Sequence, residues 1–316
     1  MSPVDLDALR AVAATHLPCD RFDHYLHYPA LPAEPPRWQT FWHTRLAQLA
    51  ADPQVELFAS PAAIVAVRDS TWDRAHFGFG MATLHVLLAA EAPDLRHQLA
   101  SVLQRCRLHL HEQDVRFVST RVNGDQLTVL HALEDAGFRF MDNVIWPVAT
   151  TASLPPTADP RVRPMVAADK PRVMALAKRW AYPRGHLYCS PGFAKDAVDA
   201  MYGKWLDTAW QSDTPLAVIE ADGAVQGFFQ YSVEREGDTP LGHRYGHMRL
   251  LVLSGDVRGR GLGQALFQGA MVLMRDQGAS HIDSGYSTKN HVSARLHARN
   301  GFASTYEEVT LHLWLG

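Results

Sequence analysis

The stretch Arg258-Gly259-Arg260-Gly261-Leu262-Gly263 decides how the second half of this chain is expected to fold. An apolar run at 248–253 precedes it, and a run with helical spacing of apolar residues follows it as far as Gly278. The pattern predicts a strand, a glycine-rich turn and a helix. Glycine lets a ligand approach the backbone closely, and the first helical turn offers unbonded N–H groups at the positive end of the dipole. We therefore expect a phosphate-binding site here.

The spacing of the glycines narrows the kind of phosphate ligand. A nucleoside-triphosphate loop needs Lys and Ser or Thr after its last glycine, whereas Gln264 and Ala265 follow Gly263. A dinucleotide fingerprint needs a third glycine where Gln264 stands, so we interpret Asp283, at the distance of a ribose-binding acid, as a coincidence. The spacing that fits is Arg-x-x-Gly-x-Gly, formed by Arg258, Gly261 and Gly263.

This loop resembles the acyl-CoA loop of the GCN5-related N-acetyltransferases (GNAT family). A second segment, Asn290 to Phe302, resembles the Asn-x-x-Ala-x-x-Leu-Tyr-x-x-x-Gly-Phe segment of the same family. Asn290, Ser293 and His297 share one helical face by their spacing, and Asn290 can cap the helix. The resemblance covers about 161–316 and implies an acetyl-CoA site made of Leu251, Val252, Leu253, Val257, Arg258, Gly259, Arg260, Gly261, Leu262, Gly263, Asn290 and Ser293.

The proton-transfer residues are less clear from the pattern. In the family a Tyr seven residues after the Asn protonates the leaving thiolate, and here that place holds His297. Histidine can donate a proton near neutral pH, so His297 is either the acid or a polar group lining the pantetheine channel. Candidate bases are His243, His247 and Glu220, of which His247 opens the strand that leads to the glycine loop. The resemblance places the oxyanion donor at the backbone N–H of Val252 or Leu253.

Composition excludes several other classes of protein. The chain has 316 residues, 47% of them apolar, and a net charge of −3, which gives no electrostatic case for nucleic acid. Cys19, Cys106 and Cys189 are scattered, which argues for a reducing compartment and against a zinc cluster. The N-terminus carries no signal-peptide pattern, and no apolar run approaches a membrane span. We expect a cytoplasmic protein with no metal.

The order of strand-like and helical patterns predicts two domains of α/β (α+β) class. The segment Thr150 to Pro160 is rich in proline and reads as a linker. We expect residues 1–152 to form an acetyltransferase-like domain without a CoA loop, 153–160 a linker, and 161–316 the GNAT catalytic domain. Each domain should contain a mixed, largely antiparallel sheet flanked by helices.

An internal sequence repeat supports this division into two related halves. Residues 132–138 and 296–302 each read as a helix followed by Gly-Phe and a last strand, with Leu133 at the place of His297. The first half lacks the glycine loop, so it resembles a degenerate copy of the second. Together with the segment Trp72 to Gly78, it also resembles the N-terminal domain of the dTDP-fucosamine acetyltransferase-like proteins.

The resemblance implies direct transfer of acetyl from acetyl-CoA to a primary amine of a small molecule, including an amino sugar linked to a nucleotide. The aromatic segment Trp180 to Phe193, with Tyr182, Arg184, His186 and Tyr188, is a candidate lining for the acceptor cleft and is expected to be a loop. Two alternatives stay open: an inactive CoA- or metabolite-binding module, and a nicotinamide-dependent enzyme. The protein is expected to act as a monomer or homodimer, without nucleic-acid or membrane partners.

Overall fold

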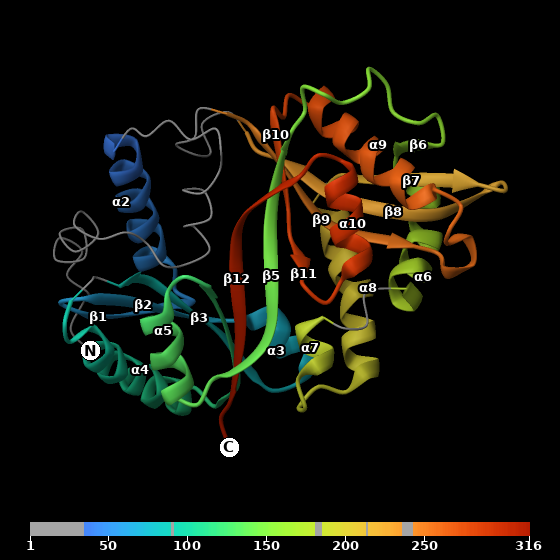
Figure 1. The fold of residues 1–316 in the computed structure, drawn as a ribbon. Helices are drawn as coiled ribbons and strands as arrows, with labels where there is room; N and C mark the ends of the chain where they lie inside the picture. The colour runs from blue at the N-terminus through green and yellow to red at the C-terminus, as the bar shows by residue number, and fades with distance from the viewer. Residues whose placement is uncertain (1–34, 90–91, 181–184, 213, 236–242) are drawn as a thin grey trace. The chain divides into compact units, whose positions relative to one another are not determined.

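The computed structural model describes residues 35–89, 92–180, 185–212, 214–235 and 243–316, and it shows a mixed α/β protein (Figure 1). The chain forms two compact units. Unit 1 comprises Met1–Val144 and Tyr306–Gly316, and unit 2 comprises Ile145–Thr305. No described helix combines the length and the apolar character that a bilayer span requires.

Unit 1 is built on strands in the order β1-β2-β3-β4-β12. The β3–β4 pairing is parallel and the other pairings are antiparallel. Its elements in chain order are α2 (Pro35–Ala51), β1 (Val55–Ser60), β2 (Ala63–Asp69), α3 (Thr71–Phe77), β3 (Gly80–Ala89), α4 (Leu95–Glu112), β4 (Val115–Asn123), α5 (Leu127–Asp135), the start of β5 (Arg139–Thr150) and most of β12 (Ala303–Trp314).

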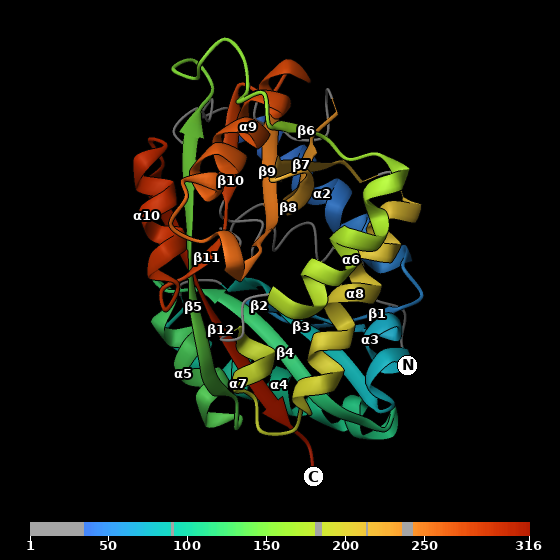
Figure 2. The same cartoon turned by 90° about the vertical axis from the view of Figure 1, so that its right-hand side faces the viewer.

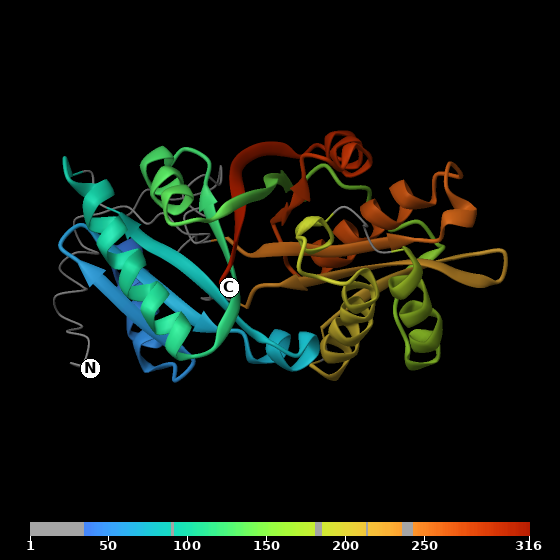
Figure 3. The ribbon, with the colours of Figure 1, turned by 90° about the horizontal axis from the view of Figure 1, so that it is seen from below.

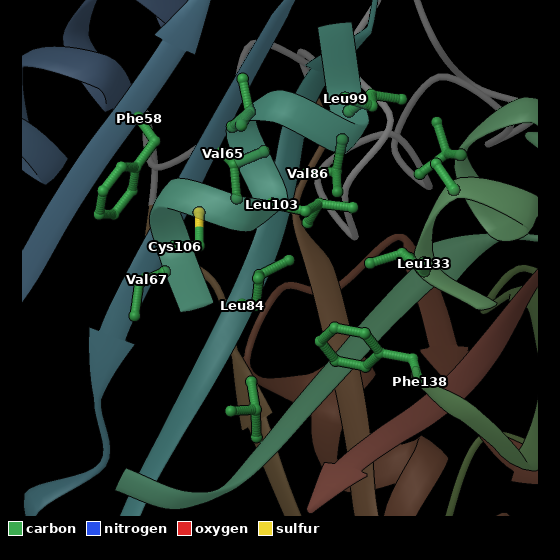
Figure 4. Packing of buried hydrophobic residues seen from close by; sticks show 14 of the residues in the cluster. Phe58, Val65, Val67, Leu84, Val86, Leu99, Leu103, Cys106, Leu133 and Phe138 are labelled. Atoms are coloured by element: carbon green, nitrogen blue, oxygen red, sulfur yellow. The ribbon is translucent and has the colours of Figure 1, made fainter. Parts of the chain in front are cut away.

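Helices α4 and α5 bury their apolar faces on one side of this sheet. The stripe that predicts an amphipathic helix at 95–111 is buried as expected, with Leu99, Leu103 and Cys106 packed on Val65 and Leu84 (Figure 4). Helix α2 contributes Leu46 and Leu49 to a smaller cluster with Ile64 and Ala66, whose side chains point to the opposite face of β2.

Unit 2 is built on strands in the order β5-β10-β9-β8-β7-β6. Its elements are β6 (Val162–Pro164), the 3₁₀ helix η2 (Ala167–Asp169), α6 (Lys170–Trp180), α7 (His186–Cys189), α8 (Lys195–Gln211), β7 (Leu216–Ala221), β8 (Ala224–Val233), β9 (Tyr245–Leu253), the 3₁₀ helix η3 (Gly255–Val257), α9 (Leu262–Asp276), β10 (His281–Ser284), β11 (Tyr286–Ser287) and α10 (His291–Arg299). The pairing of β9 with β10 is parallel, and that of β8 with β9 is antiparallel.

Two cores cover the two faces of this sheet. Helix α9 buries Leu266, Phe267 and Ala270 against Phe229 and other residues on one face. Helices α6 and α8 bury Leu176 and Leu206 against Phe228 on the other. Figures 2 and 3 show α9 and α10 on one side of β8 and β9, with α6 and α8 on the other. Because successive strand residues point to opposite faces, Phe228 and Phe229 serve different cores.

Most elements predicted from the sequence are present, with boundaries that differ by a few residues. The Asp222-Gly223 pair in the sequence predicts a hairpin turn between two strands, and this prediction is confirmed: both residues have positive φ (54° and 73°), as the tight two-residue turn between paired strands requires. The expected loop around His186 is wrong in part, because His186–Cys189 forms the short helix α7. The sequence from residue 1 to about 55 predicts mostly helix, and the part of it before residue 35 lies outside the described residues.

The expected internal repeat extends over residues 84–150 and 248–314 with a single offset. Adding 164 to the bounds of α5 (127–135) gives those of α10 (291–299), and adding 164 to β5 (139–150) gives β12 (303–314). The same offset carries the end of α4, Glu112, to the end of α9, Asp276. It also carries the last parallel pair Leu84–Thr120 to Met248–Ser284. A constant offset means that neither half has gained or lost a residue between these elements.

Equivalent positions also make the same backbone hydrogen bonds. Phe138 N–H donates to Leu133 O at 3.0 Å, and Phe302 N–H donates to His297 O at 3.1 Å. The two halves therefore share one fold, as the sequence predicts. They differ at the N-terminus of the main helix: α4 begins at Leu95, equivalent to Gly259, so it starts three positions earlier than α9.

Each unit takes its last strand from the other half of the sequence. In unit 1, β12 pairs with β4, and Leu313 lies opposite Val118. In unit 2, the end of β5 pairs with β10, and Ala149 lies opposite Ile282. These pairs are equivalent under the offset of 164. The domain limits expected from the proline-rich segment, 1–152 and 161–316, stay a prediction, and the compact units divide the chain at 144–145 and 305–306.

Candidate active site

Strands β9 and β10 part within the sheet of unit 2, and the site is built around this fork. Their parallel pairing ends at Met248 and Ser284, while β9 continues to Leu253 with β8 along its other edge. Ser254 N–H donates to Gln226 O at 2.8 Å, so by the alternation of a strand Val252 also directs its N–H towards β8. The amides of Leu251 and Leu253 then face the fork. Of the two predicted oxyanion donors, this favours Leu253 over Val252.

The glycine-rich turn follows directly at the end of β9 and opens helix α9. Gly261 is the N-cap residue with φ 77°, and Gly259 has φ 80°, a left-handed conformation that side chains other than glycine rarely adopt. A Cβ built on either residue would meet no atom within 4 Å, so the turn is open on its outer side. Val257 and Leu262 are buried and anchor the turn in the core. The backbone amides are therefore held in place while remaining accessible.

The two arginines of the turn are placed differently from each other. Arg260 donates two hydrogen bonds to the Asp222 carboxylate, at 2.6 and 3.1 Å, which ties the turn to the β7–β8 hairpin. Both side chains of this ion pair are about half exposed (48% and 60%). Arg258 is also exposed. The turn therefore carries two arginines that can contribute charge to a phosphate site, one of them paired with a carboxylate.

Helix α10 lies beside this turn. Asn290 caps α10 by accepting a hydrogen bond from Ser293 N–H at 3.1 Å, which confirms the predicted cap. At the other end of α10, Asn300 exchanges side-chain hydrogen bonds with Gln264 in the first turn of α9, at 2.8 and 3.3 Å. The two segments that resemble the family motifs are thus brought together.

His297 lies buried between α10 and α9 in a group of aromatic rings. Its ring centroid is 5.0 Å from those of Phe267 and Phe302 and 4.7 Å from that of Tyr286. Nδ1 donates to the backbone O of Ser293 at 2.7 Å, which makes Nε2 an acceptor in the neutral ring. Nε2 is buried and has no hydrogen-bond partner among the described residues.

This environment determines the charge of His297. Burial, only partly opposed by the hydrogen bond with Ser293, lowers the pKa of His297 to about 4. At neutral pH the ring is uncharged and carries a lone pair on Nε2, so this atom has no proton to give to a leaving group. The geometry therefore favours the polar-lining interpretation over the acid, and the role of His297 stays a prediction.

His247 lies on β9, one residue pair before the fork, between two carboxylates. Its Nδ1 is 2.8 Å from Asp283 Oδ2 and its Nε2 is 3.1 Å from Glu234 Oε1. All three side chains are buried. Burial opposes the charged ring, but Asp283 and Glu234 outweigh it and raise the pKa of His247 to about 9. His247 is therefore an imidazolium at neutral pH and cannot accept a further proton in that state.

The other two candidate bases lie apart from this cluster. Glu220 is on β7 and pairs with Arg163. His243 is exposed and its ring contacts that of His281, 5.0 Å away. Sequence reasoning missed Glu234 as a partner of His247 and interpreted Asp283 as a coincidence. The register of two parallel strands, which no local pattern reveals, brings Asp283 beside His247.

The predicted acceptor segment is only partly described. Tyr182 and Arg184 lie outside the described residues. His186 and Tyr188 are on α7, where the Tyr188 hydroxyl donates to Asp199 at 2.7 Å and its ring stacks on that of Tyr202, 6.2 Å away. These contacts hold α7 against α8 and give no further support for an acceptor site.

Comparisons with known proteins agree with this arrangement. Residues 182–302 match the sequence model of the acetyltransferase (GNAT) family. A GCN5-related N-acetyltransferase from Sphaerobacter thermophilus is similar in structure over 99% of this chain and 94% of its own, with TM-score 0.62 and 17% identity. A tandem GNAT protein from the clavulanic acid biosynthesis pathway is similar over 100% and 97%, with TM-score 0.55 and 15% identity.

A third similar structure belongs to a larger enzyme. It is described as a GCN5-related glucosamine N-acetyltransferase region in a fungal multi-domain β-N-acetylglucosaminidase, and it is 14% identical with TM-score 0.63. The similarity covers 99% of this chain and 37% of that one. A search of curated proteins found no match. At these identities the solved structures show the fold alone, and residues 182–302 are the part of the second half that matches the GNAT family model.

Proposed function

We propose that unit 2 transfers the acetyl group of acetyl-CoA to the primary amine of a small molecule, by direct attack of the amine on the thioester. The observation that carries this proposal is the open left-handed turn at Gly259 and Gly261, placed at the N-terminus of α9 directly beyond the fork. A diphosphate on these amides and an extended arm along the free edge of β9 are consistent with one acyl-CoA molecule.

In this proposal each residue of the site has a physical task. The amides from Val257 to Gly263 bind the pyrophosphate, with Arg258 and Arg260 contributing charge. Leu251 and Leu253 direct backbone groups at the pantetheine arm and at the developing oxyanion, which a fixed donor stabilises. Asn290 and Ser293, at the start of α10, face the same arm. Holding the two reactants together supplies much of the rate.

The acceptor class we would test first is the amino sugar, free or linked to a nucleotide. Two resemblances support this choice: that of the first half to the dTDP-fucosamine acetyltransferase-like proteins, and that of the fold to a protein described as a glucosamine N-acetyltransferase region. Both are likenesses to other proteins, so the acceptor is a proposal about this chain.

The test begins with binding. Calorimetric titration with CoA, acetyl-CoA and NAD should show binding of the first two and none of NAD. Release of CoA from acetyl-CoA is then followed with a thiol reagent, in the presence of glucosamine, dTDP-linked amino sugars, lysine and phenethylamine. Binding of NAD without CoA would defeat the proposal.

One observation favours a second candidate, a CoA-binding module without turnover. The neutral His297 ring, with its Nδ1 proton held by Ser293, provides no acid at the place where the family has Tyr. Tight binding of acetyl-CoA, with no CoA release in any arm of the amine panel, would support this candidate over the enzyme.

A further inference from the structure

Glu234, His247 and Asp283 form a charged cluster in unit 2. Because unit 1 has the same fold, its residues at the equivalent positions show whether the fold needs these charges. The residues of the cluster come from three different segments: the residue after β8, the start of β9, and β10. His247 lies opposite Asp283 in the parallel register, and the next pair, Met248 and Ser284, is the last before the fork. The cluster therefore joins the strands that form the closed end of the fork.

Unit 1 has neutral residues at the three equivalent positions. Subtracting 164 from 234, 247 and 283 gives Ser70, Thr83 and Ser119. The backbone is the same there: Ser70 N–H donates to Met81 O at 2.9 Å, as Glu234 N–H donates to Tyr245 O at 2.9 Å. Ser70 and Thr83 are joined by a hydroxyl–hydroxyl hydrogen bond of 3.3 Å.

The comparison separates the demands of the fold from those of function. In unit 1 a single hydroxyl pair, Ser70 and Thr83, links the end of β2 to β3, and Ser119 on β4 is a neutral, half-buried residue. Burying ionised groups carries a desolvation penalty of several kcal/mol per ion, and such pairs are often replaceable without loss of stability. Because the equivalent strands of unit 1 pair with three neutral residues at these positions, the fold does not require charges here. The charged version occurs in the unit that carries the glycine turn.

We propose that Glu234, His247 and Asp283 are positioning residues for acetyl transfer, which fix the separation of β9 and β10 at the point where the thioester and the amine must meet. This inference rests on the proposed function of unit 2. It assigns His247 a role other than the base, and it adds two residues to the site.

The geometry explains why charged groups suit this task. Hydrogen bonds between ionised partners are shorter and about twice as strong as those between neutral partners. The imidazolium is held at both ring nitrogens, so His247 cannot turn, and Glu234 Oε2 also accepts from Tyr245 N–H at 3.3 Å. The fork is thereby stiffened beside the Leu251 and Leu253 amides. A misplacement of about 1 Å at a reacting centre can lower the rate about 100-fold.

The test transplants the three residues of unit 1 into unit 2, as the variant Glu234→Ser/His247→Thr/Asp283→Ser. We expect a folded protein whose Kd and KM for acetyl-CoA stay within about threefold of the wild type, and whose kcat falls about 100-fold. CoA release is measured with glucosamine as acceptor and with water alone. Unchanged kcat in a folded variant would overturn the inference. The absence of CoA binding by the wild type would instead overturn the proposed function.

The single variants Asp283→Asn and Glu234→Gln keep the shape of each side chain and remove its charge, and they carry the test if the triple variant does not fold. A purely structural role would lower thermal stability and acetyl-CoA affinity together with kcat. A positioning role lowers kcat while acetyl-CoA affinity is kept, even though removing one charge of a buried pair also lowers stability. Equal losses in all three quantities would therefore also overturn the inference.

The pH dependence separates positioning from base catalysis. The charged or titratable groups around His247 are Asp283 on β10, Glu234 after β8, and Arg249 and Tyr245 on β9. In the ratio of wild-type kcat to Asp283→Asn kcat, the pH dependence that comes from ionisation of the amine acceptor cancels, because both proteins use the same acceptor. If the imidazolium positions the fork, this ratio falls as the pH rises through about 9. A ratio that rises over the same range would show that neutral His247 is the base.

Discussion

Leu133 and His297 occupy the same position in two copies of one fold. Each backbone carbonyl accepts the N–H of the phenylalanine five residues later, at 3.0 and 3.1 Å, just beyond the end of its helix. The Leu133 side chain is part of the apolar core of unit 1 (Figure 4). His297 instead has a buried ring nitrogen with no hydrogen-bond partner among the described residues. The presence of leucine at this position in unit 1 shows that an apolar side chain is sufficient for packing there.

This relationship predicts the effect of His297→Leu on stability. The pKa of His297 is lowered by burial to about 4, below the ordinary value of 6.5, so the unfolded chain binds more protons between these pH values. The wild type should lose up to about 3 kcal/mol of unfolding free energy as the pH falls from 6.5 to 4 because of this group. The variant should lose less. Urea denaturation at several pH values measures the difference, with His291→Gln, at an exposed position of α10, as the control.

His247 predicts the opposite pH dependence. Its pKa is raised above 6.5 to about 9 because the carboxylates of Asp283 and Glu234 outweigh the effect of burial. Its contribution to stability is therefore present in full below pH 6.5 and is lost as the pH rises through about 9. His247→Gln should abolish this alkaline loss while lowering stability at neutral pH. Thermal unfolding from neutral to alkaline pH checks it, and a wild-type protein with no alkaline loss would contradict it.

A matched pair of glycine substitutions tests the turn. Gly261 and Gly78 have nearly the same φ, 77° and 79°, and a Cβ on either meets no atom within 4 Å. Gly261→Trp and Gly78→Trp should therefore cost similar stability, about 1–2 kcal/mol from the left-handed backbone. Only Gly261→Trp should abolish CoA binding in a calorimetric titration. Equal CoA affinity in the two variants would show that the turn does not hold the diphosphate.

The ion pair of Arg260 with Asp222 predicts that substitutions at these residues change CoA affinity while having little effect on stability. Both groups are about half exposed, so Asp222→Asn should change the free energy of unfolding only slightly. Arg260→Ala should have a similarly small effect on stability but should weaken CoA binding several-fold, because it removes positive charge beside the turn. Asp222→Asn should leave CoA affinity unchanged or increase it, since Arg260 is released. Equal CoA affinity in all three proteins would exclude Arg260 from the site.

The placement of the end strands predicts how fragments behave. A fragment of residues 161–316 would lack the part of β5 that pairs with β10, and it would carry Leu311 and Leu313 without the core of unit 1 that buries them. We expect this fragment to aggregate rather than fold. Soluble expression with a cooperative thermal transition would contradict this. Deleting residues 306–316 from the full chain should likewise destabilise unit 1, although it leaves its other elements intact.

Local sequence patterns determined the elements and the two motifs. The spacing of apolar residues predicts α4 and α9, the Asp222-Gly223 pair predicts the β7–β8 turn, and the Arg258–Gly263 spacing predicts a phosphate-binding turn. These features depend on residues close together in the chain, because helix periodicity and turn conformation are local properties. The repeat was also visible in the sequence, since the Gly-Phe pairs at 137–138 and 301–302 mark equivalent helix ends.

Tertiary structure decided the charge of each buried group and the strands that meet. Asp283 lies 36 positions after His247 and contacts it only because β9 and β10 are parallel neighbours in one register. That contact, with Glu234, makes His247 a cation, while a group of aromatic rings makes His297 neutral. Two histidines of the same unit thus differ in charge at neutral pH: His247 is positively charged and His297 is neutral. Ionisation depends on burial and on charges brought near in space, which local sequence does not specify.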